Sequence, residues 1–332
     1  LYDQYRVPVG YAQIAPAMTA AIVAIEDRRF FSNAGFDVRA MLRALLHDAT
    51  GGSLQGASTI TQQYVKNYRI NVVDRGDPAA QQADRADTLG RKLRDAQAAV
   101  LVAARTSKPD VLAGYLDLLE FSGNVYGVAA AAHSYFATTP DRLTVPQAAL
   151  LAGMVNNPSL YDPYAHRDRA LARRNVVIDA MVRDGSLRPP EAAAAKAAPL
   201  GLAPDGPLLP GASCLAAAPD AGFFCDYAVS YLEQHGLSAD QLATGGYTIT
   251  TTMDPAAAVA VKQAVDADVP PTQPGVADAF ALLAPGRSSH QVLAMVGNRS
   301  LGDDAARGQV ATNIVAEPSN VFGGGSTFKI FT

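Results

Sequence analysis

The feature that most constrains the fold is a helical spacing of apolar residues that recurs across the first half of the chain. The stretches that carry it are AAIVAIEDRRFF, TLGRKLRDAQAAVLVAAR, PDVLAGYLDLLEF, PQAALLAGMV and DRALARRNVVIDAMV. Each places apolar side chains three or four residues apart, which forms one face of a helix. We therefore expect residues 16–181 to be mainly α-helical. The polar segment 71–88 has no such period and predicts a mobile loop.

The second half of the chain changes character. Residues 186–212 are rich in Ala, Pro and Gly, which favours a linker over a packed element. Beyond them, GGYTITTTMDP predicts a strand, AAAVAVKQAVDADV a helix, and DAFALLAP, HQVLAMVGNR and VATNIV short strands. We expect three parts: a helical domain at 1–185, a linker region at 186–245, and an α/β or α+β portion at 246–332.

Composition excludes several classes of protein. With 332 residues, of which 49% are hydrophobic and 17% charged, the chain can bury a core and form two or more domains. A net charge of −4 argues against nucleic acid as the main partner, because phosphate binding requires a basic surface. No apolar run reaches the roughly 18 residues of a membrane-spanning helix. The sequence begins at Leu1 with no signal peptide, so we expect a piece of a longer protein.

The two cysteines lie 11 residues apart, in CLAAAPDAGFFC. Cys214 and Cys225 fit neither a CxxC redox pair nor a zinc knuckle. If the protein is exported, a local disulfide is expected, and it would stabilise the fold by roughly 3 kcal/mol. The alternative is two half-buried thiols in a cytosolic protein.

Two short stretches combine charges that can do chemistry. EDRRF ends an apolar helix with Glu26 and Asp27, and a carboxylate there serves as a general base if its surroundings raise its pKa towards neutrality. RKLRD sets Arg91 and Lys92 near Asp95, where a basic cluster can stabilise a leaving phosphate. A solvated helix end and a surface face of mixed charge are the alternatives.

A third stretch, GASTITQQYVKN, has little apolar material to bury. Its hydroxyl, amide and ammonium groups suit a ligand that carries sugar or negative charge, because uncharged donors fix orientation while a lysine neutralises phosphate. The candidate binding residues are Ser58, Thr59, Gln62, Gln63, Lys66 and Asn67. A polar, capped helix is the alternative.

The order of these stretches resembles a known family. EDRRF, GASTITQQYVKN, RKLRD, KPDVLAGYLD and RRNVVI are similar, in sequence order, to the five motifs of the family 51 glycosyltransferases, the peptidoglycan polymerases. The second motif is matched throughout, and the resemblance covers residues 1 to about 185. It implies a lysozyme-like, mainly helical domain with a cleft between two lobes.

The remainder extends the resemblance to class A, bifunctional penicillin-binding proteins. GGYTITTTMDP, VLAMVGNR and GGGSTFKIFT look like the linker and opening of a penicillin-binding transpeptidase domain. In that family Ser-x-x-Lys carries the acylated serine, which here would be Ser326, with Lys329 beside it. The sequence ends at Thr332, before the SxN and KTG elements, so we expect the transpeptidase site to be incomplete and unable to acylate.

Four positions depart from the family pattern. The family's usual His is Asn33 here, its Glu of the third motif is Asp95, and its Glu and Asn of the fourth motif are Ala113 and Asp117. The carboxylate of the first motif is retained. These departures leave open whether activity is reduced.

The resemblance implies polymerisation of lipid II, a disaccharide-pentapeptide on undecaprenyl pyrophosphate, into a nascent glycan strand. Glu26 would be the base, Asp95 would assist catalysis, and Asp27 would help to bind the substrate. Lys66, Arg91 and Lys92 would stabilise the leaving pyrophosphate. Mg²⁺ or Mn²⁺ is compatible with this chemistry, but no metal ligand set can be read in the sequence. Further implications are a membrane-facing surface to which YVKNYRINVV contributes, inhibition by moenomycin, and a location on the extracytoplasmic face of the bacterial membrane, with an N-terminal anchor.

Two other functions remain open at this stage. A lysozyme-like hydrolase would use a carboxylate to protonate a glycosidic oxygen, although hydrolysis gives no reason for the cluster of Lys and Arg. A degenerate, non-catalytic relative that binds lipid II as a scaffold is the second, and the altered third and fourth motifs support it.

Overall fold

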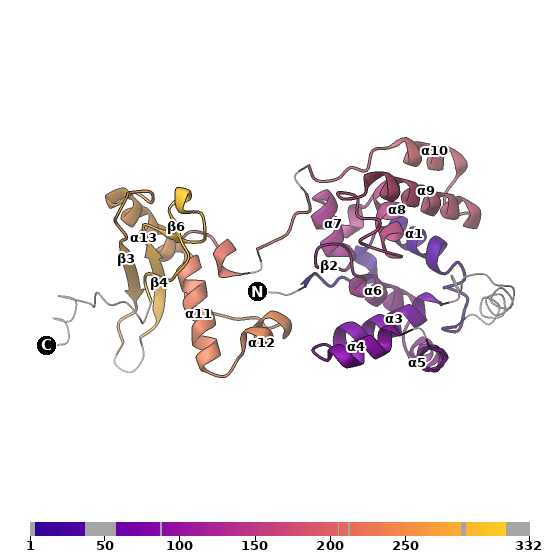
Figure 1. The fold of residues 1–332 in the computed structure, drawn as a ribbon, viewed down its shortest axis with the longest axis horizontal. Helices are drawn as coiled ribbons and strands as arrows, with labels where there is room; N and C mark the ends of the chain where they lie inside the picture. The colour runs from indigo at the N-terminus through magenta and orange to yellow at the C-terminus, as the bar shows by residue number, and fades with distance from the viewer. Residues whose placement is uncertain are drawn as a thin grey trace. The chain divides into compact units, whose positions relative to one another are not determined.

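The computed structural model describes residues 4–36, 58–86, 88–204, 206–211, 213–286 and 290–316. The chain forms two compact units, Gln4–Leu209 and a second that begins at Pro210. The first unit is built of helices with two very short strands, and the second combines helices with short strands (Figure 1). The prediction of a mainly helical first half is confirmed.

The helices of the first unit follow one another with short connections. They are α1 (Pro16–Glu26), α3 (Ile60–Tyr68), the π-helical turn η2 (Arg69–Val73), α4 (Pro78–Arg85), α5 (Leu89–Arg105), α6 (Lys108–Leu118), α7 (Val128–Phe136), α8 (Val145–Met154), α9 (Arg167–Asp184) and α10 (Pro189–Ala197), with 3₁₀ turns η1 (Tyr11–Gln13) and η3 (Pro140–Arg142). Strands β1 (Tyr5–Arg6) and β2 (Val125–Tyr126) pair in parallel.

Side-chain caps fix where the functional helices begin. Thr59 and Gln62 form a reciprocal capping box at the start of α3, in which the Thr59 hydroxyl accepts from the Gln62 amide nitrogen at 3.2 Å. Thr88 and Ser107 accept in the same way at the starts of α5 and α6. Each cap satisfies a backbone donor that has no partner inside its helix. The polar motifs therefore begin at defined positions.

One apolar core joins the helices of the first unit. Helix α1 packs against α8 and α9, while α3 packs against α5 and α6. Side chains of α1 and α6, among them Ile22 and Leu112, are fully buried in the same cluster. In Figure 1, α8, α9 and α10 lie on one side of the unit, α3, α4 and α5 on the other, and α6 between them. The C-terminal end of α1 contacts α3 through hydrogen bonds to Glu26 and Asp27.

The predicted mobile loop at 71–88 is wrong, because this segment contains α4. Asp77 caps the helix by accepting from the amide nitrogens of Ala79 and Ala80, each at 3.0 Å, and Pro78 occupies the first helical position. The segment has few apolar residues, but Asp84 is buried and paired with arginines. Ion pairs, rather than an apolar stripe, attach this helix to the unit.

The second unit confirms part of the prediction for it. Its elements are η4 (Cys214–Ala216), α11 (Gly222–Gln234), α12 (Ala239–Thr244), α13 (Pro255–Asp268), β3 (Ala279–Leu283), β4 (Val292–Gly297), β5 (Ser300–Leu301), η5 (Ala305–Arg307) and β6 (Gln309–Val310). Strands β3 and β4 pair in antiparallel fashion, and they confirm two of the predicted short strands. The predicted helix at 256–269 is α13.

Two predicted strands are wrong. The Thr-rich stretch before Asp254 exposes its threonines, so it has no buried face. It makes isolated hydrogen bonds to β4, such as that from the Thr252 hydroxyl to the Val292 carbonyl at 2.6 Å, without forming a strand ladder. At 310–315 only Val310 is in a strand, because the Asn313 side chain accepts from the following backbone amides and makes a turn.

The predicted disulfide is confirmed. Cys214 and Cys225 are joined, with Cα atoms 5.5 Å apart, and the bond links η4 to α11. Helix α10 lies inside the segment predicted to be a linker, and its Ala192 and Ala195 are buried against the core of the first unit. The domain limits at 185 and 245 stay predictions. In the part of the chain that the structure describes, no helix has the length and apolar character to cross a bilayer.

Candidate active site

Glu26 is the last residue of α1, and its carboxylate points to α3. Its Oε2 accepts from Gln63 Nε2 at 2.9 Å, across 37 positions of sequence. Burial raises the pKa of Glu26 above its ordinary value, although the hydrogen bond from Gln63 and the charge of Arg173 oppose this shift and Asp27 adds to it. A carboxyl of raised pKa is closer to the pH at which it exchanges protons efficiently.

Gln63 also contacts the next helix. Tyr115 of α6 is fully buried, and its hydroxyl donates to Gln63 Oε1 at 2.9 Å. Helices α1, α3 and α6 are therefore connected by one chain of two hydrogen bonds that ends on the Glu26 carboxylate. Tyr115 was not among the candidates that the sequence offers.

The Asp27 carboxylate accepts hydrogen bonds from within the protein. Its Oδ2 accepts from Asn33 Nδ2 at 2.9 Å and from the Ile60 amide at 3.2 Å, and its Oδ1 accepts from the Arg29 amide at 3.2 Å. These bonds attach the end of α1 to the start of α3. Burial raises the pKa of Asp27, while the three hydrogen bonds and the charge of Lys108 lower it.

Asn33 links Asp27 to a cation that sequence reasoning missed. The Lys108 ammonium donates to Asn33 Oδ1 at 2.8 Å and lies 4.5 Å from the centre of the Phe30 ring. Burial lowers the pKa of Lys108, and the charge of Asp27 opposes this. The family's usual His is thus replaced here by an amide that donates to the carboxylate and accepts from the lysine.

The six candidate residues of GASTITQQYVKN separate into distinct places. Ser58 is exposed, and Thr59 and Gln62 form the cap of α3. Gln63 turns towards Glu26, whereas Lys66 and Asn67 line a cavity of about 250 Å³. The other lining residues are Ile70, Asn71, Arg85, Leu118 and Glu120. Since one helical turn is 3.6 residues, the cavity begins about one turn along α3 from Gln63.

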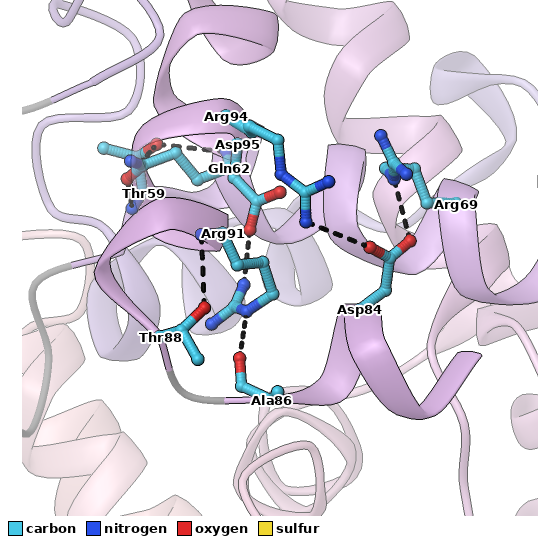
Figure 2. A network of polar contacts seen from close by, with 9 residues as sticks. All are labelled: Thr59, Gln62, Arg69, Asp84, Ala86, Thr88, Arg91, Arg94 and Asp95. Atoms are coloured by element: carbon cyan, nitrogen blue, oxygen red, sulfur yellow. Dashed lines mark hydrogen bonds and ion pairs between the residues drawn. The ribbon is translucent and has the colours of Figure 1, made fainter. Parts of the chain in front are cut away.

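A second polar cluster surrounds the start of α5. Arg91 and Asp95 are both buried and form an ion pair one turn apart, and Arg91 also donates to the Ala86 carbonyl (Figure 2). Burial raises the pKa of Asp95, and the neighbouring charge of Arg91 opposes this shift. Lys92 is half-buried. Although its side chain is shorter than that of a glutamate, Asp95 therefore reaches Arg91.

Asp84 joins this cluster from α4. Its carboxylate accepts from Arg69 Nε at 2.7 Å and lies 3.8 Å from Arg94 Nη2 (Figure 2). Arg69 follows α3, and Arg94 belongs to α5. Asp84 thus connects the helix that carries Gln63 and Lys66 to the helix that carries the basic motif. Sequence reasoning missed it because its partners lie 15 and 10 residues away.

The fifth motif supplies two neighbouring arginines with different environments. Arg174 is fully buried and donates to the carbonyls of Ala198 and Lys196 at 2.8 and 2.7 Å. Arg173 donates to the Gly153 carbonyl at 3.3 Å, and its charge acts on Glu26. Arg174 therefore holds the end of α10, while Arg173 contributes to the electrostatics of the site.

No group of three His, Cys, Asp or Glu side chains suited to a metal occurs among the described residues. Ser326 and Lys329 lie outside the described residues.

The Transglycosylase family model matches residues 1–182. The chain belongs to the transglycosylase family. The match confirms the resemblance in the first half of the sequence.

Curated relatives of this transglycosylase are penicillin-binding proteins. Penicillin-binding protein 1A of Mycobacterium tuberculosis is 32% identical over 98% of this chain and 37% of its own length. Penicillin-binding protein 1F of Bacillus subtilis is 32% identical over 76% of this chain and 33% of its own. Penicillin-binding protein 1A of Escherichia coli is 36% identical over 55% of this chain and 20% of its own length. The chain thus spans less than two fifths of each of these relatives.

Proposed function

We propose that the first unit is a peptidoglycan glycosyltransferase that polymerises lipid II into glycan strands and releases undecaprenyl pyrophosphate. The observation that carries the proposal is the Glu26 carboxylate: burial raises its pKa, and Gln63 holds it within the segment that matches the transglycosylase family. The names of the relatives support a role in cell-wall synthesis.

In the proposed reaction Glu26 acts as general base. Its carboxylate takes the proton from a sugar hydroxyl of the acceptor while that oxygen forms a bond to the anomeric carbon of the donor. The bond from this carbon to the pyrophosphate oxygen breaks, and the electron pair leaves with the pyrophosphate, so the anomeric configuration inverts. Proton removal by a positioned base typically contributes about 10²–10⁴-fold to a rate.

The leaving pyrophosphate requires fixed positive charge. Lys66 and Arg85 line the cavity one turn from Gln63, where the Asn67 amide adds a hydrogen-bonding group. Arg91 and Lys92 begin α5, which packs against α3. We assign stabilisation of the pyrophosphate to Lys66, Arg91 and Lys92, because charges held in place before the reaction cost no reorganisation during it.

The remaining candidates support the site. Thr59 and Gln62 fix the start of α3, and Asp27 attaches the end of α1 to it. Asp95 orients Arg91 through their ion pair. Ser58 is exposed near the start of α3, and we assign to it a contact with the substrate.

The lipid tail of the substrate requires a membrane surface nearby. Tyr68, Val72 and Val73, at the end of α3 and in η2, are 43%, 44% and 60% exposed. We propose that these side chains rest on the outer leaflet of the cytoplasmic membrane, on its extracytoplasmic side, and that moenomycin inhibits the enzyme. For the whole protein, we propose a second, transpeptidase activity in which Ser326 is the nucleophile and Lys329 assists it.

Incubation with lipid II, followed by analysis of glycan length with and without moenomycin, tests the proposal. We expect strands that lengthen with time, and moenomycin should stop them. Glu26→Gln keeps the shape of the side chain but cannot take a proton, so it should lower the rate by about 10²–10⁴-fold and still bind lipid II. Shortened glycans would indicate a hydrolase, and binding without turnover a scaffold; either result would overturn the proposal.

A further inference from the structure

The side-chain amide of Gln63 stands between a buried phenol and the carboxylate of Glu26. Its nitrogen donates to Glu26 Oε2 and its oxygen accepts from the Tyr115 hydroxyl, each at 2.9 Å. An amide has one donor end and one acceptor end, so a half-turn about its last bond would exchange them. Only one of the two directions suits an ionised Glu26.

Tyr115 decides between these directions. Its side chain is fully buried, so its single proton needs an acceptor inside the protein, and Gln63 Oε1 is that acceptor. Burial, together with the charge of Glu26, raises the pKa of Tyr115 well above its ordinary value, so the phenol keeps its proton. In the reversed amide, the oxygen would face the Glu26 carboxylate, and two acceptors would oppose each other.

We propose that Tyr115 is a positioning residue, which fixes the direction of the Gln63 amide and thereby keeps Glu26 in the form that accepts a proton. The catalytic consequence rests on the proposed function, whereas the hydrogen-bond geometry does not. Tyr115 contacts the catalytic carboxylate only through Gln63. Its hydroxyl, rather than its ring, carries the effect.

Other charges around Glu26 stay in place when Tyr115 is changed. Arg173 comes from α9 and favours the ionised form, and Asp27 is the next residue along the chain and disfavours it. Neither donates to or accepts from Gln63 in the contacts that fix the amide. A change in the ionisation of Glu26 after removal of the Tyr115 hydroxyl is therefore a change in the amide.

The first test measures ionisation directly and needs no substrate. The carboxyl carbon of Glu26 is followed by NMR during a pH titration of protein labelled with ¹³C-glutamate, and Glu26→Gln assigns the signal. We expect Tyr115→Phe to raise the pKa of Glu26 by about half a unit to one unit. Weakening of a hydrogen bond to a charged group changes its ionisation equilibrium by up to about tenfold, and tenfold corresponds to one pKa unit. Gln63→Leu should raise it by at least as much.

The double variant separates a positioning role from an independent one. Because Tyr115 acts through Gln63, Tyr115→Phe combined with Gln63→Leu should shift the pKa no further than Gln63→Leu alone. Tyr135→Phe is the matched control: Tyr135 is also fully buried, and its hydroxyl donates to the Ser122 carbonyl at 3.2 Å. The control should leave the titration of Glu26 unchanged.

The second test is the pH profile of initial rates with lipid II. We expect the acid limb of Tyr115→Phe to move upward in pH with the Glu26 titration. An unchanged pKa in Tyr115→Phe, an additive double variant, or an equal shift in Tyr135→Phe would each overturn the inference. If the wild-type chain makes no glycan but the titration shifts as expected, the proposed function fails and the positioning of Gln63 stands.

Discussion

Replacement of Asp84 by alanine should detach α4 locally from the rest of the first unit. The Asp84 side chain is 6% exposed, while its partners Arg69 and Arg94 are 39% and 58% exposed. Removal of one partner from a fully buried ion pair costs about 3–5 kcal/mol, and from an exposed pair about 0–1 kcal/mol. With a buried carboxylate and half-exposed arginines, we expect about 2 kcal/mol, or roughly a 30-fold change in the opening equilibrium.

Hydrogen exchange followed by mass spectrometry measures this opening. Amides of residues 78–85 should exchange about 30-fold faster in Asp84→Ala, and by a smaller factor in Asp84→Asn, which keeps one acceptor oxygen. Asp179→Ala is the matched control, because its carboxylate pairs with Lys196 at 2.5 Å but is 57% exposed. It should change exchange in α10 about threefold or less. Unchanged exchange in α4 of Asp84→Ala would refute the reasoning.

The effect should also depend on pH in one direction. Burial opposes ionisation of Asp84, but hydrogen bonds from Arg69 and Asp74, together with the charges of Arg69 and Arg94, hold its pKa below the ordinary value. Its stabilising effect is therefore present above the ordinary aspartate pKa of about 3.9 and lost as the pH falls through the lowered value. The difference between wild type and Asp84→Ala should be constant from pH 5 to 8 and shrink below about pH 4.

Three further changes test other parts of the chain. Asp95→Asn removes the charge that orients Arg91 and should lower initial polymerisation rates by about 10²-fold; full activity in this variant, with a faster Asp95→Glu, would show that Asp95 is not used. Cys214→Ser should destabilise the second unit by about 3 kcal/mol, seen as faster exchange in α11, without slowing polymerisation. Unchanged exchange would contradict this. Burial, opposed by the Val9 amide and the charge of Arg6, raises the pKa of Asp117 to about 6. Stability from this group is lost as the pH rises through that value, so Asp117→Asn should raise the Tm at pH 7 and leave it unchanged near pH 4, and an effect independent of pH would exclude this cause.

Helices α1, α5, α6, α8 and α9 could be predicted because their apolar spacing is local information, whereas α10 lies in a segment predicted to be a linker. Helix α4 could not be predicted from spacing, because ion pairs to Arg69 and Arg94 hold it. Its start nevertheless had a signal, the Asp-Pro pair at 77–78, which is a cap followed by proline at the first helical position. At 247–253, alternation of threonines imitates a strand although no side is buried. A periodic sequence pattern therefore predicts a helix or strand only when one face of that element is buried.

Within the candidate site, residue types could be predicted but not their partners. Glu26 and Gln63 were both candidates, yet nothing local indicates that they contact each other across 37 positions. Tyr115 donates to Gln63, the charge of Arg173 acts on Glu26, and Lys108 donates to Asn33. All three belong to helices that begin much later in the sequence. Such contacts depend on how α3, α6 and α9 pack around the end of α1. Periodicity and motif spacing do not contain that information.

Two of the four departures from the family pattern lie on α6, and the two side chains have different surroundings. Ala113 is buried in the apolar core, so this position carries no polar group towards the site. Asp117 accepts from the Val9 amide with both oxygens, at 3.2 and 3.3 Å, and attaches the N-terminal segment to α6.

The other two departures bear on whether the site is degenerate. Asn33 donates to Asp27 and accepts from Lys108, so a continuous polar connection joins α1 to α6. Asp95 pairs with Arg91 in spite of its shorter side chain. A scaffold that had lost catalysis would have no requirement to keep buried charges paired, since an apolar replacement of a buried pair is often neutral or stabilising. The retained pairs therefore favour a working transferase over a lipid-binding relative.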